Sequence, residues 1–403
     1  MSNVLLVNLR SSFLLSPSAI LPSLGTLYIA SALESRGHTA TIVDLDNTHP
    51  PLTGHNPDFI GISATTPHVA IIRPIMGDLR NWYKGVPIIL GGPHFTARPE
   101  DAVTLGADCV CVGDGEQVML DALEGRRGTL QHLINLDEWP FPARHLINLN
   151  NYTYKMAGHP ATSMMTARGC PYTCAYCSRG FGGDILRNRS LDLVDKEIAS
   201  IKRLGIDGIV LYDDEVNIST KRLLDLCSVF ASHKVRWRAF VRSNLFTAEQ
   251  ARAMADSGCW EVCSGVETGS DEILKRVGKR ATVADATRAR RLTAEAGMRF
   301  KAFTLIGLPG ETEETAQLTK EWLLRERPDS FDICPFTPYP GSDMADHPER
   351  YDIVIERSYW DERYYHKGKL GQYHVCARTA ALSSERIAEL RDEIEREVNE
   401  ALT

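Results

Sequence analysis

Short runs of apolar, β-branched residues alternate with helical patterns along the first 125 residues. The runs predict five strands, at Val4–Val7, Ala40–Val43, Phe59–Ile62, Ile88–Leu90 and Cys109–Val112. Apolar positions at helical spacing predict helices between several of them, at Leu24–Glu34, Val69–Tyr83 and Glu116–Leu123. Strands that alternate with helices favour an α/β fold. We predict a doubly wound parallel sheet of the Rossmann or flavodoxin type, forming a first domain over residues 1–125.

The alternation stops near residue 126 and resumes near residue 159, so residues 126–158 are predicted to be a linker. Six further strands are predicted, at Ser163–Thr166, Ile209–Tyr212, Trp237–Val241, Glu261–Val266, Phe300–Ile306 and Phe331–Pro335. Six strand–helix repeats predict a partial (β/α)6 barrel over residues 159–345, with its site at the carboxyl ends of the strands. Residues 346–403 are predicted to be a short helical C-terminal cap that ends in a polar helix, Ser383–Ala401.

Charge and composition narrow the partners. The chain has 45 Lys and Arg against 52 Asp and Glu, a net charge of −7, without a block of basic residues. This balance does not favour a nucleic-acid-binding surface. No apolar stretch approaches the length of a membrane span, and the first residues lack the basic and apolar regions of a signal peptide. We therefore expect a cytoplasmic protein without membrane or nucleic-acid partners.

Three of the ten cysteines, Cys170, Cys174 and Cys177, lie within eight residues, directly after the first predicted strand of the second domain. Thiolates are soft ligands that suit iron–sulfur clusters. Spacings of three and two intervening residues let one loop wrap its sulfurs around a cubane cluster and leave one iron for a chelating ligand. A zinc site or three buried cysteines are the alternatives, although no second Cys/His pair lies close enough to complete a zinc site.

The segment 168–177 and the later strand ends resemble the radical S-adenosylmethionine (SAM) superfamily, specifically members with an N-terminal cobalamin-binding-like domain. The resemblance covers about residues 1–345. It implies a 4Fe-4S cluster on Cys170, Cys174 and Cys177, whose reduced form splits SAM. The resulting 5′-deoxyadenosyl radical abstracts hydrogen from an unactivated carbon. The positions that the resemblance assigns to SAM are Tyr176, Asp213, Asp214, Glu215, Ser243, Asn244, Glu267, Ile306 and Gly307.

Small and polar residues follow the predicted strands of the first domain, where ligands bind in doubly wound sheets. In the resemblance these strand ends hold cobalamin, at Ser63, Thr65, Gly91, Gly92, Gly113, Gly115 and Glu116. The Asp-x-His-x-x-Gly motif that supplies a cobalt-ligating histidine is absent after the first strand. His68 and His94 are better interpreted as polar strand-end residues than as cobalt ligands.

The combination predicts a cobalamin-dependent radical methyltransferase that acts on a small molecule and takes electrons from an external flavodoxin- or ferredoxin-type donor. An alternative keeps the radical chemistry without methyl transfer, as in cyclisation, oxidation, dehydration or rearrangement, and without a need for cobalamin. RNA methylthiolation is disfavoured because the extra N-terminal cysteine cluster and an RNA-binding barrel are absent from the sequence. A non-enzymatic cobalamin or metal sensor would not need the SAM-contacting strand ends.

Overall fold

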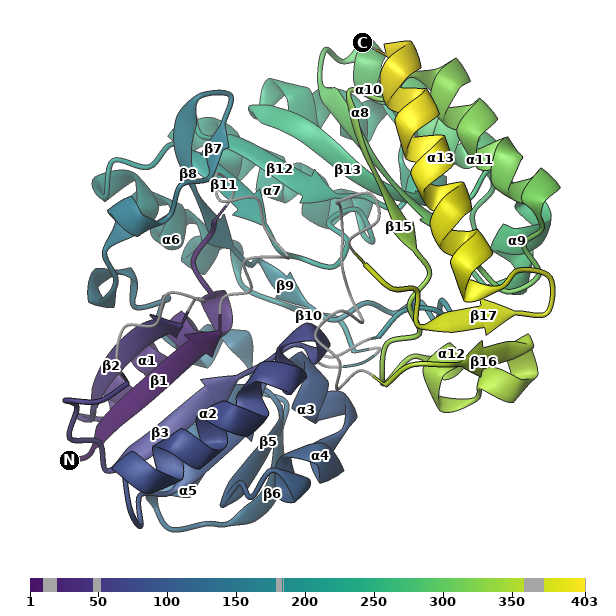
Figure 1. The fold of residues 1–403 in the computed structure, drawn as a ribbon. Helices are drawn as coiled ribbons and strands as arrows, with labels where there is room; N and C mark the ends of the chain where they lie inside the picture. Colours follow the sequence, from purple (N-terminus) through teal and green to yellow (C-terminus); the bar gives the residue numbers. More distant parts are fainter. Residues whose placement is uncertain (10–19, 46–51, 179–182, 184, 359–372, 403) are drawn as a thin grey trace. The chain divides into compact units, whose positions relative to one another are not determined.

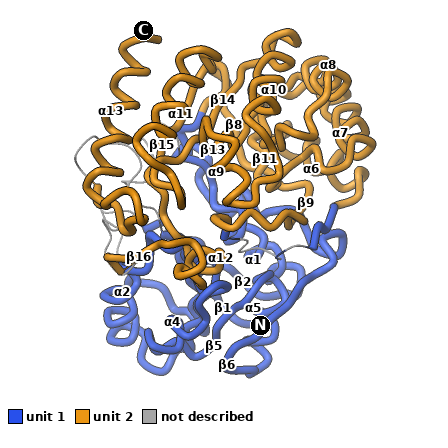
Figure 2. Tube along the Cα trace, turned by 90° about the vertical axis from the view of Figure 1, so that its right-hand side faces the viewer, with its two compact units in different colours: residues 1–154, 178–188, 359–362 blue, residues 155–177, 189–358, 363–403 orange. Residues whose placement is uncertain are grey.

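The computed structural model describes residues 1–9, 20–45, 52–178, 183, 185–358 and 373–402. These residues form two compact units, which we describe separately (Figure 2). Unit 1 contains the described residues of 1–154 and 178–188. Unit 2 contains residues 155–177, 189–358 and 373–402.

Unit 1 is a six-stranded parallel sheet in the order β2-β1-β3-β4-β5-β6. Its strands are β1 (Asn3–Leu9), β2 (Thr39–Leu45), β3 (Phe59–Ser63), β4 (Ile88–Gly91), β5 (Cys109–Gly113) and β6 (Gly128–His132). Its helices are α1 (Leu24–Ser35), α2 (Val69–Trp82), α3 (Pro93–Ala97), α4 (Pro99–Thr104) and α5 (Gly115–Leu123). This is the flavodoxin-type order, in which the direction of winding reverses between β1 and β3.

Alternate residues of β1 enter two separate cores. Val4 and Leu6 pack with residues of α1 and α5, whereas Leu5 and Val7 pack with residues of α2. Because side chains point to opposite faces of a strand in turn, helices must cover both faces of the sheet. The predicted doubly wound sheet is confirmed (Figure 1).

The sixth strand is a correction to the prediction of five. β6 pairs in parallel with β5, yet it lies inside residues 126–158, for which the sequence predicts only a connection. That prediction is wrong for this segment. The sequence Gly-Thr-Leu-Gln-His is polar and largely exposed at the edge of the sheet, so it lacks the apolar run by which buried strands are identified.

Unit 2 contains six consecutive parallel strands, in the order β15-β14-β13-β12-β11-β8, with β7 antiparallel at the edge. The strands are β7 (Lys155–Met156), β8 (His159–Met164), β11 (Gly208–Leu211), β12 (Arg236–Phe240), β13 (Cys259–Glu267), β14 (Arg299–Ile306) and β15 (Ser330–Pro335). The helices between them are α6 (Leu191–Arg203), α7 (Thr220–His233), α8 (Ala248–Asp256), α9 (Asp271–Arg276), α10 (Val283–Glu295) and α11 (Glu313–Glu326). The predicted partial barrel is confirmed.

One predicted strand is displaced. β8 ends at Met164, and Thr166 lies outside it because its backbone N–H donates to the Asp213 carboxylate at 2.6 Å. The short strands β9 (Ala167–Arg168) and β10 (Arg187–Asn188) occur on either side of the cysteine segment.

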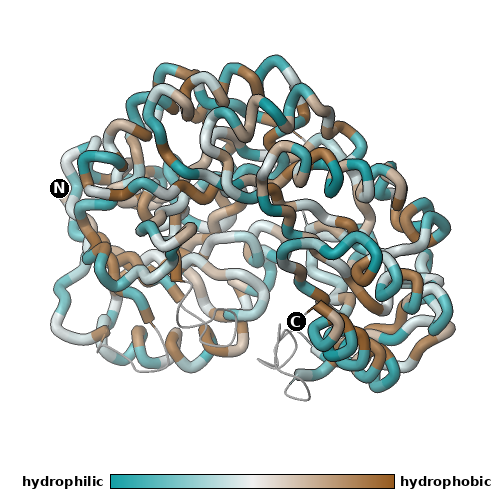
Figure 3. Tube along the Cα trace, turned by 90° about the horizontal axis from the view of Figure 1, so that it is seen from above, coloured by the Kyte–Doolittle hydropathy of each residue, from teal (hydrophilic) through white to brown (hydrophobic). Residues whose placement is uncertain are grey.

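The C-terminal part of unit 2 ends in a long amphipathic helix. Before that helix, this part of the unit contains α12 (Asp343–Asp346) and an antiparallel pair of strands, β16 (Ile353–Ile355) and β17 (Ala377–Thr379). The last helix, α13 (Ser384–Leu402), buries Ile387, Leu390, Ile394 and Val398 at helical spacing. Hydrophobic and hydrophilic positions alternate along it in Figure 3. It packs beside α11 and β15 (Figure 1), and its bounds lie within one residue of the helix predicted at Ser383–Ala401.

Candidate functional site

The three clustered cysteines lie on a loop that other repeats of unit 2 fix in place. Cys174 is buried, Cys170 is half-buried and Cys177 is exposed. Between them, the N–H of Ala175 donates to the carbonyl of Val277 at 3.0 Å, and its own carbonyl accepts from the N–H of Met344 at 3.1 Å. The loop is therefore tied to the segments that follow β13 and β15.

Two acids at the end of β11 hold the start of this loop. Both oxygens of Asp213 accept hydrogen bonds from Thr166, one from its backbone N–H and one from its hydroxyl. Asp214 accepts from the N–H of Gly169 at 3.0 Å. Burial raises the pKa of Asp213 to about 6, although these hydrogen bonds oppose the rise. Asp213 thus anchors the entry to the cysteine loop.

The end of β13 carries a buried ion pair in a strained backbone. Glu267 has φ +66° and follows a bulge in the pairing of β13 with β14. Its carboxylate accepts from Lys279 Nζ at 2.7 Å and from the Tyr176 hydroxyl at 3.0 Å. Gly265 makes room for this arrangement, since a Cβ there would lie 2.1 Å from Glu267 Oε1. The network fixes Tyr176, the residue before the third cysteine.

Arg242 approaches the cysteine loop from the end of β12. Its Nη1 donates to Cys174 Sγ at 3.8 Å, and its guanidinium lies 3.7 Å from the centroid of the Tyr172 ring. Its Nη2 donates to the carbonyl of Lys279. Burial raises the pKa of the Cys170 thiol, and the charge of Arg242 opposes that rise.

Two hydrogen-bond acceptors of predicted SAM residues lack partners within the described residues. They are Glu215 Oε2, after β11, and Asn244 Oδ1, after β12. Burial raises the pKa of Glu215 to about 7, while Lys279 and Arg242 act in the opposite direction. Buried acceptors of this kind call for a ligand that donates hydrogen bonds, and the ammonium and ribose hydroxyl groups of SAM are such donors. The residues present therefore fit SAM. Ser243 precedes Asn244, and its carbonyl accepts from Arg288.

The turn after β14 is held by a buried carboxylate. Glu311 accepts from the N–H of Gly307 at 2.5 Å and from the Thr268 hydroxyl at 3.3 Å. Ile306 is fully buried, and Gly307 has φ +93°, with Ile387 packed against the position of its missing side chain. Burial raises the pKa of Glu311 to about 7. The predicted adenine segment is thus a rigid turn.

Lys279 and Glu311 are central to this site but were not among the predicted site residues. Both lie in irregular segments after a helix or strand, where periodicity carries no signal. Only the short Leu-Pro-Gly-Glu sequence that contains Glu311 marks the turn as unusual.

The thiol set matches a cluster better than a single ion. Within the described residues, no three His, Cys, Asp or Glu side chains could hold one metal ion together. In a cubane cluster each thiolate binds a different iron, so the sulfurs need not converge on one point. The three thiols on one pinned loop fit the cluster.

In unit 1 the predicted cobalamin residues lie at the carboxyl ends of β3, β4 and β5. Ser63 ends β3 beside the point where the winding reverses, and the Thr65 hydroxyl contacts His68 Nδ1 at 3.0 Å. A Cβ at Gly92, where φ is +97°, would lie 2.7 Å from the backbone of Ala64. This glycine is thus required by the packing of the protein's own backbone.

The packing of the protein itself also requires the remaining glycines of this set. A Cβ at Gly91 would meet Cys111, one at Gly113 would meet the carbonyl of His132, and one at Gly115 would meet Ile29. Glu116 is buried in the first turn of α5. These positions leave the strand ends without bulky side chains, which fits a large flat ligand, but the glycines alone do not identify it.

The two histidines that the sequence raised as possible cobalt ligands, His68 and His94, are held in hydrogen bonds. His94 Nδ1 lies 3.1 Å from the Thr66 hydroxyl, and its Nε2 lies 3.0 Å from Asp101. Burial lowers the pKa of His68 to about 4. Both are buried polar residues near strand ends, in line with the sequence interpretation.

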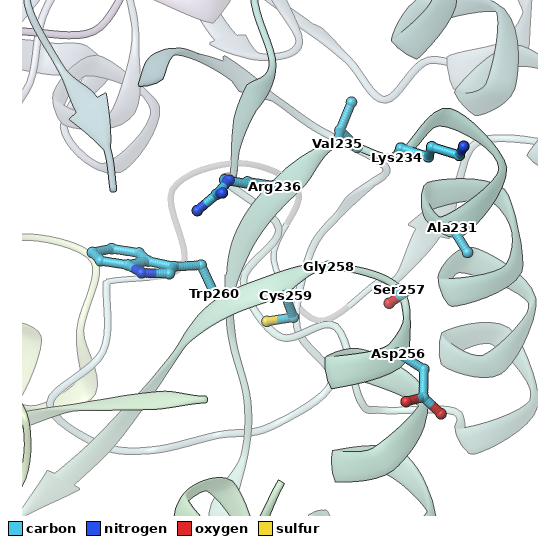
Figure 4. Close-up of a pocket in the computed structure, with 9 residues that line it drawn as sticks. All are labelled: Ala231, Lys234, Val235, Arg236, Asp256, Ser257, Gly258, Cys259 and Trp260. Carbon is cyan, nitrogen blue, oxygen red and sulfur yellow. The ribbon is translucent and has the colours of Figure 1, made fainter. Parts of the chain in front are cut away.

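A pocket of about 430 Å³ in unit 2 lies away from the predicted site residues. It is lined by the C-terminal ends of α7 and α8 and by the amino ends of β12 and β13, including Lys234, Arg236 and Trp260 (Figure 4). By contrast, the cysteine loop and the acids of the predicted site follow the carboxyl ends of the strands. This pocket is therefore at the opposite end of the sheet from the predicted SAM site.

Comparisons with known proteins agree with this geometry. Residues 164–323 match the radical SAM superfamily, and residues 12–123 match the B12 binding domain. An uncharacterized methyltransferase of Pyrococcus horikoshii is 29% identical over 372 residues, covering 83% of this chain and 80% of that protein. The anaerobic magnesium-protoporphyrin IX monomethyl ester cyclase of Rubrivivax gelatinosus is 24% identical, covering 80% of this chain and 65% of the cyclase.

The fold is also that of a solved structure. The radical SAM methyltransferase TsrM from Kitasatospora setae, solved with cobalamin and a [4Fe-4S] cluster, superposes with a TM-score of 0.74 at 18% identity. The match covers 100% of this chain and 89% of TsrM. Separately, no helix in the described residues is long and apolar enough to cross a membrane.

A radical SAM domain uses a 4Fe-4S cluster and SAM, and a B12 binding domain takes cobalamin, so all three predicted cofactors are supported. From its two family matches and its fold, this chain belongs to the radical SAM superfamily, among the members that carry an N-terminal B12 binding domain.

Proposed function

We propose that this chain is a cobalamin-dependent methyltransferase that methylates an unactivated carbon of a small molecule by radical SAM chemistry. One observation carries the proposal: a three-thiol loop in a half-barrel and a flavodoxin-order sheet matching the B12 binding domain occur in one chain. Its 29% identity to a methyltransferase supports methyl transfer. When bound, the cofactors supply one-electron cleavage of a sulfonium bond and a methyl group carried on cobalt.

The protein's own residues would bind and orient these groups. Cys170, Cys174 and Cys177 ligate the cluster, and the hydrogen bonds of Ala175 keep their loop fixed. Glu215 Oε2 and Asn244 Oδ1, the two buried acceptors without partners among the described residues, accept hydrogen bonds from SAM. Among the other residues that the resemblance assigns to SAM, those proposed to contact it are Tyr176, Ser243, Glu267, Ile306 and Gly307. Asp213 and Asp214, which it assigns there as well, are proposed to position the cysteine loop beside SAM. The residues proposed to contact cobalamin are Ser63, Thr65, Gly91, Gly92, Gly113, Gly115 and Glu116.

The proposal includes an external electron donor of the flavodoxin or ferredoxin type, because cluster reduction needs an electron that the chain does not supply. It also places the protein in the cytoplasm. None of the ten cysteines, all of which are among the described residues, forms a disulfide, as is usual in a reducing compartment.

The test uses full-length protein reconstituted anaerobically with iron, sulfide and cobalamin, then supplied with reductant and methyl-deuterated SAM. We expect bound cobalamin and release of both S-adenosylhomocysteine and 5′-deoxyadenosine, with the deuterated methyl group appearing in a small molecule of a cell extract. If the protein carries its iron–sulfur cluster and cleaves SAM but binds no cobalamin, cobalamin-dependent methyl transfer is refuted.

A second candidate is a radical reaction without methyl transfer, such as cyclisation, oxidation, dehydration or rearrangement. The relative named as a cyclase, 24% identical to this chain, favours it. In the same assay it predicts 5′-deoxyadenosine without S-adenosylhomocysteine and a product that carries no deuterium.

A further inference from the structure

Arg242 is the buried cation that directly contacts a proposed cluster ligand. Its Nη1 lies 3.8 Å from Cys174 Sγ, and only 3% of the residue is exposed. A guanidinium keeps its positive charge at any pH that a protein tolerates. A permanent charge and an N–H donor are therefore fixed beside this sulfur.

The position of Arg242 is set on both sides. Its backbone N–H donates to Asn217 Oδ1 at 2.8 Å, and its carbonyl accepts from Asn217 Nδ2 at 3.0 Å. The guanidinium lies on the ring of Tyr172, which belongs to the cysteine loop. Because backbone and head group are both held, the contact with Cys174 is part of the folded state.

The charge of Arg242 is also not neutralised by a close carboxylate. Lys279, the neighbouring buried cation, is paired with Glu267 at 2.7 Å. In the described part of the chain, no carboxylate lies within ion-pair distance of Arg242. Its charge therefore acts both on the thiol loop, where it opposes the raised pKa of Cys170, and on Glu215, whose raised pKa it also opposes.

We propose that Arg242 tunes the iron–sulfur cluster, making it easier to reduce through the hydrogen bond to Cys174 and through its fixed positive charge, which has no ion-pair partner among the described residues. The proposal rests on the function proposed above. The step is [4Fe-4S]²⁺ + e⁻ → [4Fe-4S]⁺, with the electron from a low-potential flavodoxin- or ferredoxin-type donor, or from dithionite in the assay. No proton is transferred. The added negative charge is stabilised by N–H donors to the sulfurs and by net positive charge nearby.

The experiment compares reconstituted full-length wild type with Arg242→Gln, Arg242→Lys and the control Arg236→Gln, measuring iron content and the cluster midpoint potential by EPR-monitored titration. Arg236 lies at the other end of β12 and is exposed. We expect Arg242→Gln to retain iron and to lower the equilibrium constant of reduction at least tenfold, a shift of about −59 mV for one electron. Arg242→Lys should shift less, and Arg236→Gln should match wild type.

Arg242→Gln with full iron and an unchanged potential would overturn the proposal. If that variant takes up no cluster, wild type labelled with guanidino-¹⁵N arginine decides: pulsed EPR of the reduced cluster should detect ¹⁵N coupling that Arg242→Lys loses. No coupling in wild type overturns the role of Arg242. Failure of wild type to bind any cluster would instead refute the proposed function.

Discussion

The buried ion pair of Lys279 and Glu267 makes a quantitative prediction about the site. The pair spans 2.7 Å, and its side chains are 7% and 10% exposed. At an effective dielectric constant of about 20, such a distance gives an attraction of about 6 kcal/mol before desolvation is subtracted. Lys279→Met removes the attraction but leaves the Glu267 carboxylate buried, which should cost about 3–5 kcal/mol.

The double variant Lys279→Met/Glu267→Gln separates charge from packing. It removes both charges and keeps an acceptor for the Tyr176 hydroxyl, so it should lie closer to wild type than Lys279→Met does. A surface pair is the control: Lys221 and Asp225 are 2.8 Å apart, but their side chains are 87% and 37% exposed. Lys221→Met should cost only about 0.5 kcal/mol or less.

Hydrogen–deuterium exchange of β13 amides in the cluster-free protein measures the effect. A loss of about 3–5 kcal/mol corresponds to exchange roughly 10²- to 4 × 10³-fold faster, because each 1.4 kcal/mol is a factor of about ten. Lys221→Met should change exchange of α7 amides about twofold. Two results would refute this reasoning. One is an exchange rate of β13 amides in Lys279→Met within threefold of wild type. The other is a double variant whose β13 amides exchange as fast as those of Lys279→Met, because the unpaired buried charge would then not be the cause of the destabilisation.

Three further predictions address the site. Cys174→Ala should lose the cluster and 5′-deoxyadenosine formation, whereas Cys227→Ala, in the core of unit 2, should keep both; equal iron contents would contradict the assignment. Glu311 has a folded pKa of about 7 above its ordinary value of 4.5, so its contribution to stability is complete below about pH 4.5 and lost as pH rises through 7. Relative to Glu311→Gln, wild type should lose on the order of 3 kcal/mol between pH 4.5 and 8, and parallel melting curves would refute this. Glu215→Gln should weaken SAM binding by about 1.5–3 kcal/mol at full iron content, while Asp213→Asn should mainly lower iron loading; calorimetry and iron analysis would show the reverse if the roles are exchanged.

The sequence predicted the buried strands well because helices cover both faces of each sheet. Strands in that setting are continuous apolar runs, and β3, β4 and β5 of unit 1 all follow runs of this kind. The edge strand β6 has no such requirement and could not be identified in this way. Likewise, β8 ends early because Asp213, which follows the neighbouring strand β11, accepts a hydrogen bond from the N–H of Thr166. This is a tertiary effect that the local sequence does not show.

The site was predictable at the level of strand ends but not of partners. Parallel strands place their carboxyl ends together, so a strand-end acid such as Glu267 can be singled out from sequence. The pairing of Glu267 with Lys279 could not be predicted, because Lys279 lies in an irregular segment where the sequence has no periodic pattern. Gly92 shows the converse: its glycine is explained by a 2.7 Å approach to Ala64, so a bulky replacement there tests folding before it tests cobalamin binding.

The three consecutive acids after β11 show how the structure separates residues that the sequence treats alike. Asp213 and Asp214 bind Thr166 and Gly169 at the start of the cysteine loop, and each thereby loses acceptor capacity for a cofactor. Glu215 keeps a buried oxygen that has no partner among the described residues. Since burying an acceptor without a donor costs about 1–3 kcal/mol, a ligand that donates a hydrogen bond to this oxygen would remove that cost. Of the three acids, Glu215 therefore has the strongest physical reason to bind SAM, and the other two to shape the loop that holds the cluster.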